Sequence, residues 1–111
     1  MLIVFPSEKL QRLLSSSKAV AKTYGPENAR KLRSRLDDLE AARNLDEMRH
    51  LPGRTHELHG DRVGTFAIDL HKGWRLIFEP GENPPPRKPD EGLDWTRIES
   101  IRILNVEDYH D

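Results

Sequence analysis

Residues 56–78 read HELHGDRVGTFAIDLHKGWRLIF, and this stretch decides the fold of the chain. Phe66, Ile68 and Leu70 alternate with Ala67 and Asp69, which is the period-two pattern of a strand with one buried face. A Lys-Gly turn then leads into a second β-prone run, WRLIF. The stretch therefore predicts a short strand, a basic turn and an antiparallel hairpin, with titratable side chains beside the core positions.

The composition sets limits on the protein class. The chain has 111 residues, which suits a single domain over 1–111. Its 18 Lys and Arg against 19 Asp and Glu give a net charge of −1, which argues against an overall basic nucleic-acid binder. No cysteine is present, so disulfides and cysteine chemistry are excluded. No apolar segment is long enough to span a membrane, and we expect a cytoplasmic protein.

The residues before this stretch predict a strand and two helices. Residues 2–5 read as a strand ended by Pro6, and Ser7 is a good N-cap for a first helix that runs to about Tyr24-Gly25. Pro26 begins a second helix, whose apolar residues recur at intervals of three and four: Ala29, Leu32, Leu36 and Leu39. A break at Asn44 precedes a further helical turn to Leu51.

The residues after it predict a long loop and a last strand. Residues 80–97 hold five prolines and two glycines, which predicts a surface loop that is partly polyproline II. Residues 98–106 carry the apolar side chains of a final strand. The element order predicts an α+β fold with two helices packed on one sheet.

Three motifs in this order resemble a known family. They are Leu58-x-Gly60-Asp61-Arg62-x-Gly64, residues 74–78 (WRLIF) and residues 106–110 (VEDYH). The chain resembles the RelE/ParE superfamily, and within it the HigB-type plasmid maintenance system killer toxins. The resemblance implies a microbial RNase-like fold, in which two N-terminal helices pack on a twisted antiparallel sheet. The loop at about 80–97 is then an insertion relative to shorter members.

The resemblance implies a toxin of a type II toxin–antitoxin system. Such toxins cleave mRNA on the ribosome without a metal or another cofactor, and a HigA-like helix-turn-helix antitoxin neutralises them. Operator DNA is bound only through that antitoxin. Two alternatives stay open: a ParE-like toxin that inhibits gyrase by binding, and an inactive binding module of the same fold. ParE-like members generally lack the C-terminal Asp-Tyr-His cluster, so its presence favours the nuclease.

Carried over by position, the resemblance assigns six active-site residues: His56, His59, Arg75, Asp108, Tyr109 and His110. His59 stands where many members have lysine, so a permanent charge becomes one that titrates near neutral pH. A metal-independent ribonuclease needs a base for the ribose 2′-OH, an acid for the leaving oxygen and fixed cations for the phosphate. We expect His56 and His110 to be the acid–base pair and Arg75 to be the phosphate clamp.

Each of these residues has a plainer alternative. The histidines could be surface residues, Asp108 an ordinary C-terminal acid and Tyr109 a residue that packs the sheet edge. His56 and His59 suggest a metal site, but residues three apart on a strand face opposite sides and a third ligand is not evident. Five further cations could contact RNA or be solvated charges: Arg62 in the turn, and Arg30, Lys31, Arg33 and Arg35 on the second helix.

Overall fold

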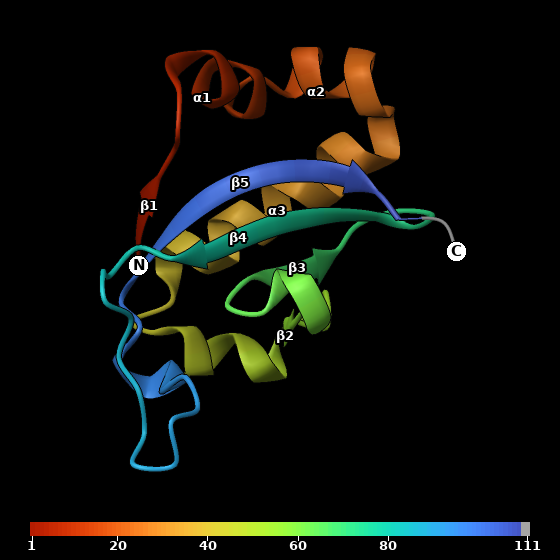
Figure 1. Ribbon diagram of the computed structural model, residues 1–111. Coiled ribbons are helices and arrows are strands. Elements are labelled where there is room, and N and C mark those ends of the chain that lie inside the picture. The colour runs from red at the N-terminus through yellow and green to blue at the C-terminus, as the bar shows by residue number, and fades with distance from the viewer. Residues whose placement is uncertain (110–111) are drawn as a thin grey trace.

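The structure, a computed structural model, describes residues 1–109. Its five-stranded sheet has the order β1-β5-β4-β3-β2 (Figure 1). The strands are β1 (Leu2–Val4), β2 (His56–Glu57), β3 (Phe66–Asp69), β4 (Trp74–Pro80) and β5 (Ser100–Asp108). The helices are α1 (Glu8–Ser15), α2 (Ser17–Tyr24) and α3 (Pro26–Ala41), with 3-10 turns at Leu45–His50, Gly60–Arg62 and Trp95–Arg97. The α+β class and the three strands expected from residues 56–78 are confirmed.

The sheet is mixed, so the expectation of a wholly antiparallel sheet was wrong. β1 pairs parallel to β5, with Leu2 opposite Ser100 and Val4 opposite Arg102. The other neighbours are antiparallel. A parallel pair requires a long crossover connection, and here nearly the whole chain lies between the two strands. This pairing depends on contacts between the chain ends, which local patterns do not encode.

The first predicted helix is broken into two. Ser16 has extended backbone angles (φ −111°, ψ 108°), and its hydroxyl accepts a hydrogen bond from Ala19 N at 3.1 Å. Serine competes with helix geometry in this way and favours the N-cap position. The break lets α1 and α2 each bury one side chain, Leu14 and Val20. The protein therefore has three helices before the sheet's hairpin, where we expected two.

The main core lies between α3 and one face of the sheet. α3 lies behind β4 and β5 in Figure 1, and its predicted apolar stripe of Ala29, Leu32, Leu36 and Leu39 is buried as expected. Phe66 and Phe78 stack at 5.4 Å on the sheet side of this core. The opposite face has a smaller cluster made of Leu58, Ala67, Ile77 and Leu104. Ala67 is therefore buried although the alternation placed it on the polar face.

A β-bulge in β5 determines which side chains reach the open face of the sheet, away from α3. Ile77 pairs with Asn105 and Phe78 with Ile103, so one extra residue, Leu104, is inserted in β5. Without it, strict alternation from Ile103 would point Glu107 and Tyr109 toward the helices. With it, these two side chains lie on the open face, where the site is found.

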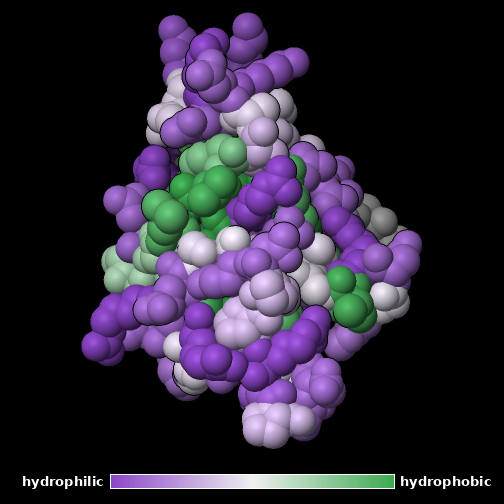
Figure 2. All heavy atoms as spheres, turned by 60° about the vertical axis from the view of Figure 1, so that its left-hand side comes forward, coloured by the Kyte–Doolittle hydropathy of each residue, from purple (hydrophilic) through white to green (hydrophobic). Residues whose placement is uncertain are grey.

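Two surface properties complete the description. No helix within residues 1–109 has both the length and the apolarity needed to cross a bilayer. Figure 2 shows apolar surface at the level of β1, among mostly charged side chains. Leu2 and Val4 of this edge strand are 67% and 40% exposed.

Candidate functional site

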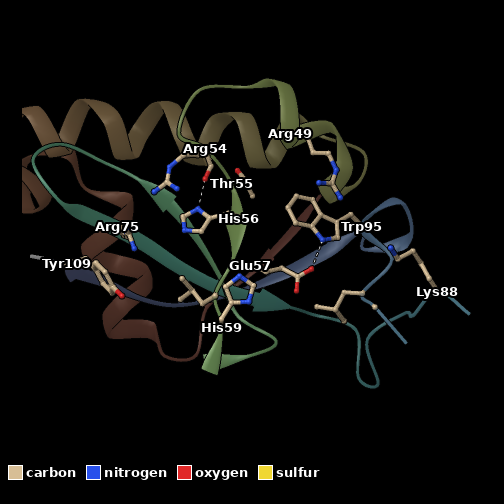
Figure 3. A pocket seen from close by; sticks show the side chains of 13 residues that line it. Arg49, Arg54, Thr55, His56, Glu57, His59, Arg75, Lys88, Trp95 and Tyr109 are labelled. Carbon is tan, nitrogen blue, oxygen red and sulfur yellow. Dashed lines mark hydrogen bonds between the residues drawn. The ribbon is translucent and has the colours of Figure 1, made fainter. Parts of the chain in front are cut away.

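A cleft of about 830 Å³ lies at the β2 edge of the sheet, between the open face and the proline-rich loop (Figure 3). The described lining contains six basic side chains and one carboxylate, Glu57. The basic residues are Arg49, Arg54, His56, His59, Arg75 and Lys88. Each of the four Arg and Lys side chains is also paired with an aspartate, Asp46, Asp69 or Asp90. The hollow therefore presents several cationic groups to a ligand, but their charge is largely balanced by carboxylates.

Asp69 holds two arginines of the cleft in place. Its Oδ2 lies 2.9 Å from Arg54 Nε, and its Oδ1 lies 3.3 Å from Arg75 Nε. Asp69 and Arg75 are opposite each other on β3 and β4, so the hairpin register sets this pair. Two guanidinium groups share one carboxylate, and the group as a whole keeps a positive charge.

Arg75 also stacks on Tyr109. Its guanidinium carbon lies 4.0 Å from the centre of the tyrosine ring. The backbone of Tyr109 is held by a hydrogen bond from its N–H to Gly73 O at 2.8 Å. The adjacent Trp74 points to the other face, where it meets Tyr24 edge-on at 5.0 Å. The expected alternation in β4 is thus confirmed, and Arg75 and Tyr109 come together as two of the six assigned residues.

The backbone around residue 54 orients the imidazole of His56. Nδ1 of His56 lies 2.7 Å from the carbonyl oxygen of Arg54. A carbonyl oxygen can only accept, so Nδ1 carries the hydrogen and Nε2 of the neutral ring is an acceptor. The chain reaches this geometry through two left-handed residues, Gly53 (φ 108°) and Arg54 (φ 52°). At Gly53 an added Cβ would lie 2.5 Å from Ile68 Cγ2, so this tight turn requires glycine.

His59 lines the same cleft from the turn that follows β2. It is the N-cap of the 3-10 turn Gly60–Arg62 and is exposed. His56 and His59 therefore belong to a strand and a turn, and the opposite-face argument for one strand does not describe them. Within residues 1–109, no three His, Asp or Glu side chains are grouped so that they could hold a metal ion.

The other predicted cations lie outside the cleft. Arg62 forms an ion pair with Glu107 at 2.5 Å, and this carboxylate raises the pKa of Arg62. On α3, Arg30 pairs with Glu27 and Arg33 with Asp37, while Arg35 donates to the carbonyl oxygen of Asp69 at 3.3 Å. Lys31 shares that helix and is also absent from the described lining. Of the predicted basic stripe, Arg30 and Arg33 are thus paired locally, Arg35 is held against β3, and none of the four lines the cleft.

The proline-rich loop supplies a wall of the cleft that the sequence did not indicate. Trp95 is buried, and its Nε1 donates to Glu57 Oε1 at 2.9 Å. Arg49 lies over the same indole, with its guanidinium carbon 3.7 Å from the ring centre. An isolated bridge between Arg87 and Leu93 closes the loop. A lone tryptophan in a proline-rich segment was the available signal, because such a large apolar side chain favours burial.

The C-terminal cluster is described only in part. Asp108 is the last residue of β5, opposite Trp74, and Tyr109 follows it. His110, the expected partner of His56 in acid–base chemistry, lies outside the described residues.

No family model and no curated protein matches this chain.

Proposed function

We propose that this protein is the toxin of a type II toxin–antitoxin pair, with a RelE-like fold of the HigB branch, and that it cleaves mRNA on the ribosome in the cytoplasm. The observation that carries the proposal is the cleft that Arg54, Arg75 and His56 line together, with both arginines paired to Asp69 and Nε2 of His56 an acceptor. These are the groups that cleavage of RNA by its own 2′-hydroxyl requires. The motif order described above is the second support.

The proposed reaction uses the ribose as the nucleophile. His56 Nε2 takes the proton of the 2′-OH as that oxygen attacks the adjacent phosphorus. The bond from phosphorus to the 5′-oxygen breaks, and that oxygen leaves with a proton from His110. Arg75 and Arg54 stabilise the charge on the phosphate oxygens, since guanidinium groups grip two such oxygens at once. The products are a 2′,3′-cyclic phosphate and a free 5′-hydroxyl, and one proton has moved from the 2′-OH to His56 and one from His110 to the 5′-oxygen.

Two neighbouring residues have supporting roles in this scheme. Tyr109, fixed beneath Arg75, gives an aromatic face for a base next to the cut. His59 lines the same cleft from the turn after β2, at the position where the resembling toxins carry a lysine. Asp108 is paired with Trp74 on the helix side of the sheet and is not part of the described lining, so the scheme gives it no direct role.

The proposed protein partner is a HigA-like helix-turn-helix antitoxin, through which any contact with operator DNA is made. An exposed apolar edge strand supports a protein contact, because Leu2 and Val4 lie in the open on β1. Co-expression with such a helix-turn-helix antitoxin should abolish toxicity and give a stable complex on gel filtration.

The test is induced expression followed by primer extension on a reporter mRNA. The parent is compared with His56→Ala, His110→Ala and the matched control Arg12→Ala, whose ion pair with Glu8 is exposed and far from the cleft. New 5′ ends that depend on translation, that persist in Arg12→Ala and that vanish in both histidine variants support the nuclease. Growth arrest without cleavage would instead indicate a ParE-like gyrase inhibitor. Folded protein with neither effect would indicate an inactive binding module.

A further inference from the structure

The cleft is bounded at both ends by an arginine that stacks on an aromatic ring. Figure 3 shows Arg75 with Tyr109 at one end and Arg49 with Trp95 at the other, and His56 lies between them. The first stack belongs to the proposed catalytic site. The second comes from the 3-10 turn Leu45–His50 and the proline-rich loop, and the cleavage mechanism does not use it.

The second stack is rigidly built. Trp95 is 7% exposed, its ring meets Phe66 edge-on at 5.2 Å, and its N–H is held by Glu57. Arg49 covers the indole, and its Nε lies 2.6 Å from Asp46 Oδ1. The Arg49 side chain is 48% exposed, so its guanidinium is accessible to a ligand while it lies over the indole. Nucleic-acid bases stack on guanidinium planes as they do on aromatic rings.

The surroundings of this stack fit a single strand of nucleic acid. Lys88 comes from the loop at the same end of the cleft; its side chain is 52% exposed, and its Nζ lies 3.7 Å from Asp90 Oδ2, a loose pair from which a phosphate could draw it. The carboxylate of Glu57 repels phosphate, so the sugar-phosphate backbone should lie on the side of the strand away from it. The base edges would then face Glu57, whose carboxylate accepts hydrogen bonds from base amino groups. The volume of about 830 Å³ lies in the upper part of the range of about 300–1,000 Å³ that holds drug-sized ligands.

We propose that the loop adds a second nucleotide subsite, in which a base of single-stranded RNA stacks on the guanidinium of Arg49. Its neighbouring phosphate meets Lys88, and the strand continues across His56 to the Arg75–Tyr109 end. The subsite rests on the proposed function, since it extends the same RNA along the same cleft. It makes Arg49 and Lys88 residues that determine the length and sequence of RNA the protein accepts.

The experiment uses a four-nucleotide RNA whose 2′-oxygens are all methylated, so that it binds but cannot be cleaved. Binding is followed by NMR at millimolar ligand, which detects weak association. The parent should show shifts at two places, the indole N–H of Trp95 and the ring of Tyr109. Arg49→Ala and Arg49→Lys should both weaken binding by about fivefold to a hundredfold, the effect of losing one stacked base. The lysine variant retains the charge, so it isolates stacking, and Arg12→Ala should bind like the parent.

Three results would overturn the subsite. Shifts confined to Tyr109 and Arg75 would mean that the RNA occupies one end only, and the nuclease proposal would stand. Equal shifts at Trp95 with inorganic tripolyphosphate would mean that the loop end binds anions and recognises no base. An absence of shifts at either end would exclude RNA from the cleft in solution, while primer extension on translated mRNA would still decide the nuclease proposal by itself.

Discussion

Replacing Arg75 by alanine should separate catalysis from folding. The side chain is 19% exposed and makes two contacts, an ion pair with Asp69 at 3.3 Å and the stack on Tyr109 at 4.0 Å. Asp69 retains Arg54 at 2.9 Å after the substitution, so no carboxylate is left without a cation. The variant therefore avoids the large penalty of a stranded charge.

The expected loss of cleavage rate is much larger than the expected loss of stability. An ion pair near the surface contributes about 0.2–1 kcal/mol and a partly exposed cation–π contact about 0.5–1 kcal/mol. Arg75→Ala should therefore lower the free energy of unfolding by about 1–2 kcal/mol, within the roughly 5–15 kcal/mol of a native domain. A charged donor aimed at the transition state contributes far more to the rate, about 10²–10³-fold. The cleavage rate should fall by that factor while the protein remains folded.

The assay pairs urea unfolding with primer extension in a translating extract. Arg102→Ala is the matched control, because Arg102 of β5 forms a cross-strand ion pair with Glu79 of β4 at 3.3 Å but lies outside the cleft. Arg75→Lys, which retains the charge without the planar fork, should fall between parent and alanine variant. A folded Arg75→Ala protein that cleaves at the parental rate would refute the role of Arg75.

Three further predictions concern the scaffold. Gly53→Ala should destabilise the protein by about 2–4 kcal/mol in urea unfolding, since the added Cβ meets Ile68 Cγ2 at 2.5 Å in a left-handed turn, and unchanged stability would contradict the required glycine. Asn28→Ala should cost about 1–3 kcal/mol, because this buried amide accepts from His71 N at 2.8 Å, and a cost near zero would mean that the amide is replaceable. Hydrogen bonds from the Thr96 hydroxyl and, second, from Arg97 lower the pKa of Asp94 below its ordinary 3.8. The ionised carboxylate therefore stabilises the fold fully above pH 3.8, and this stabilisation is lost as the pH falls through the lowered pKa. Asp94→Asn should therefore be less stable than the parent at pH 7, and the difference between their urea midpoints should shrink below about pH 4. A difference that does not change with pH would show that ionisation of Asp94 does not stabilise the fold.

Local patterns predicted the parts of the fold that depend on neighbours in the sequence. The alternation at 66–70, the WRLIF run and the stripe from Ala29 to Leu39 each follow from the period of one element, and each became the expected strand or helix. The helix break at Ser16 was missed, because a serine run is compatible with both a helix and a cap until packing selects one.

The candidate site divides along the same line. By itself the sequence determined where the two hairpin strands lie and which face of the sheet Arg75 takes, because strand alternation depends only on neighbours in the sequence. Tertiary structure alone decided that the bulge at Leu104 turns Tyr109 onto Arg75, that β1 runs parallel to β5, and that Trp95 closes the far end of the cleft. Those contacts join segments that are distant in sequence, and their free energy comes from packing that exists only once the chain has folded.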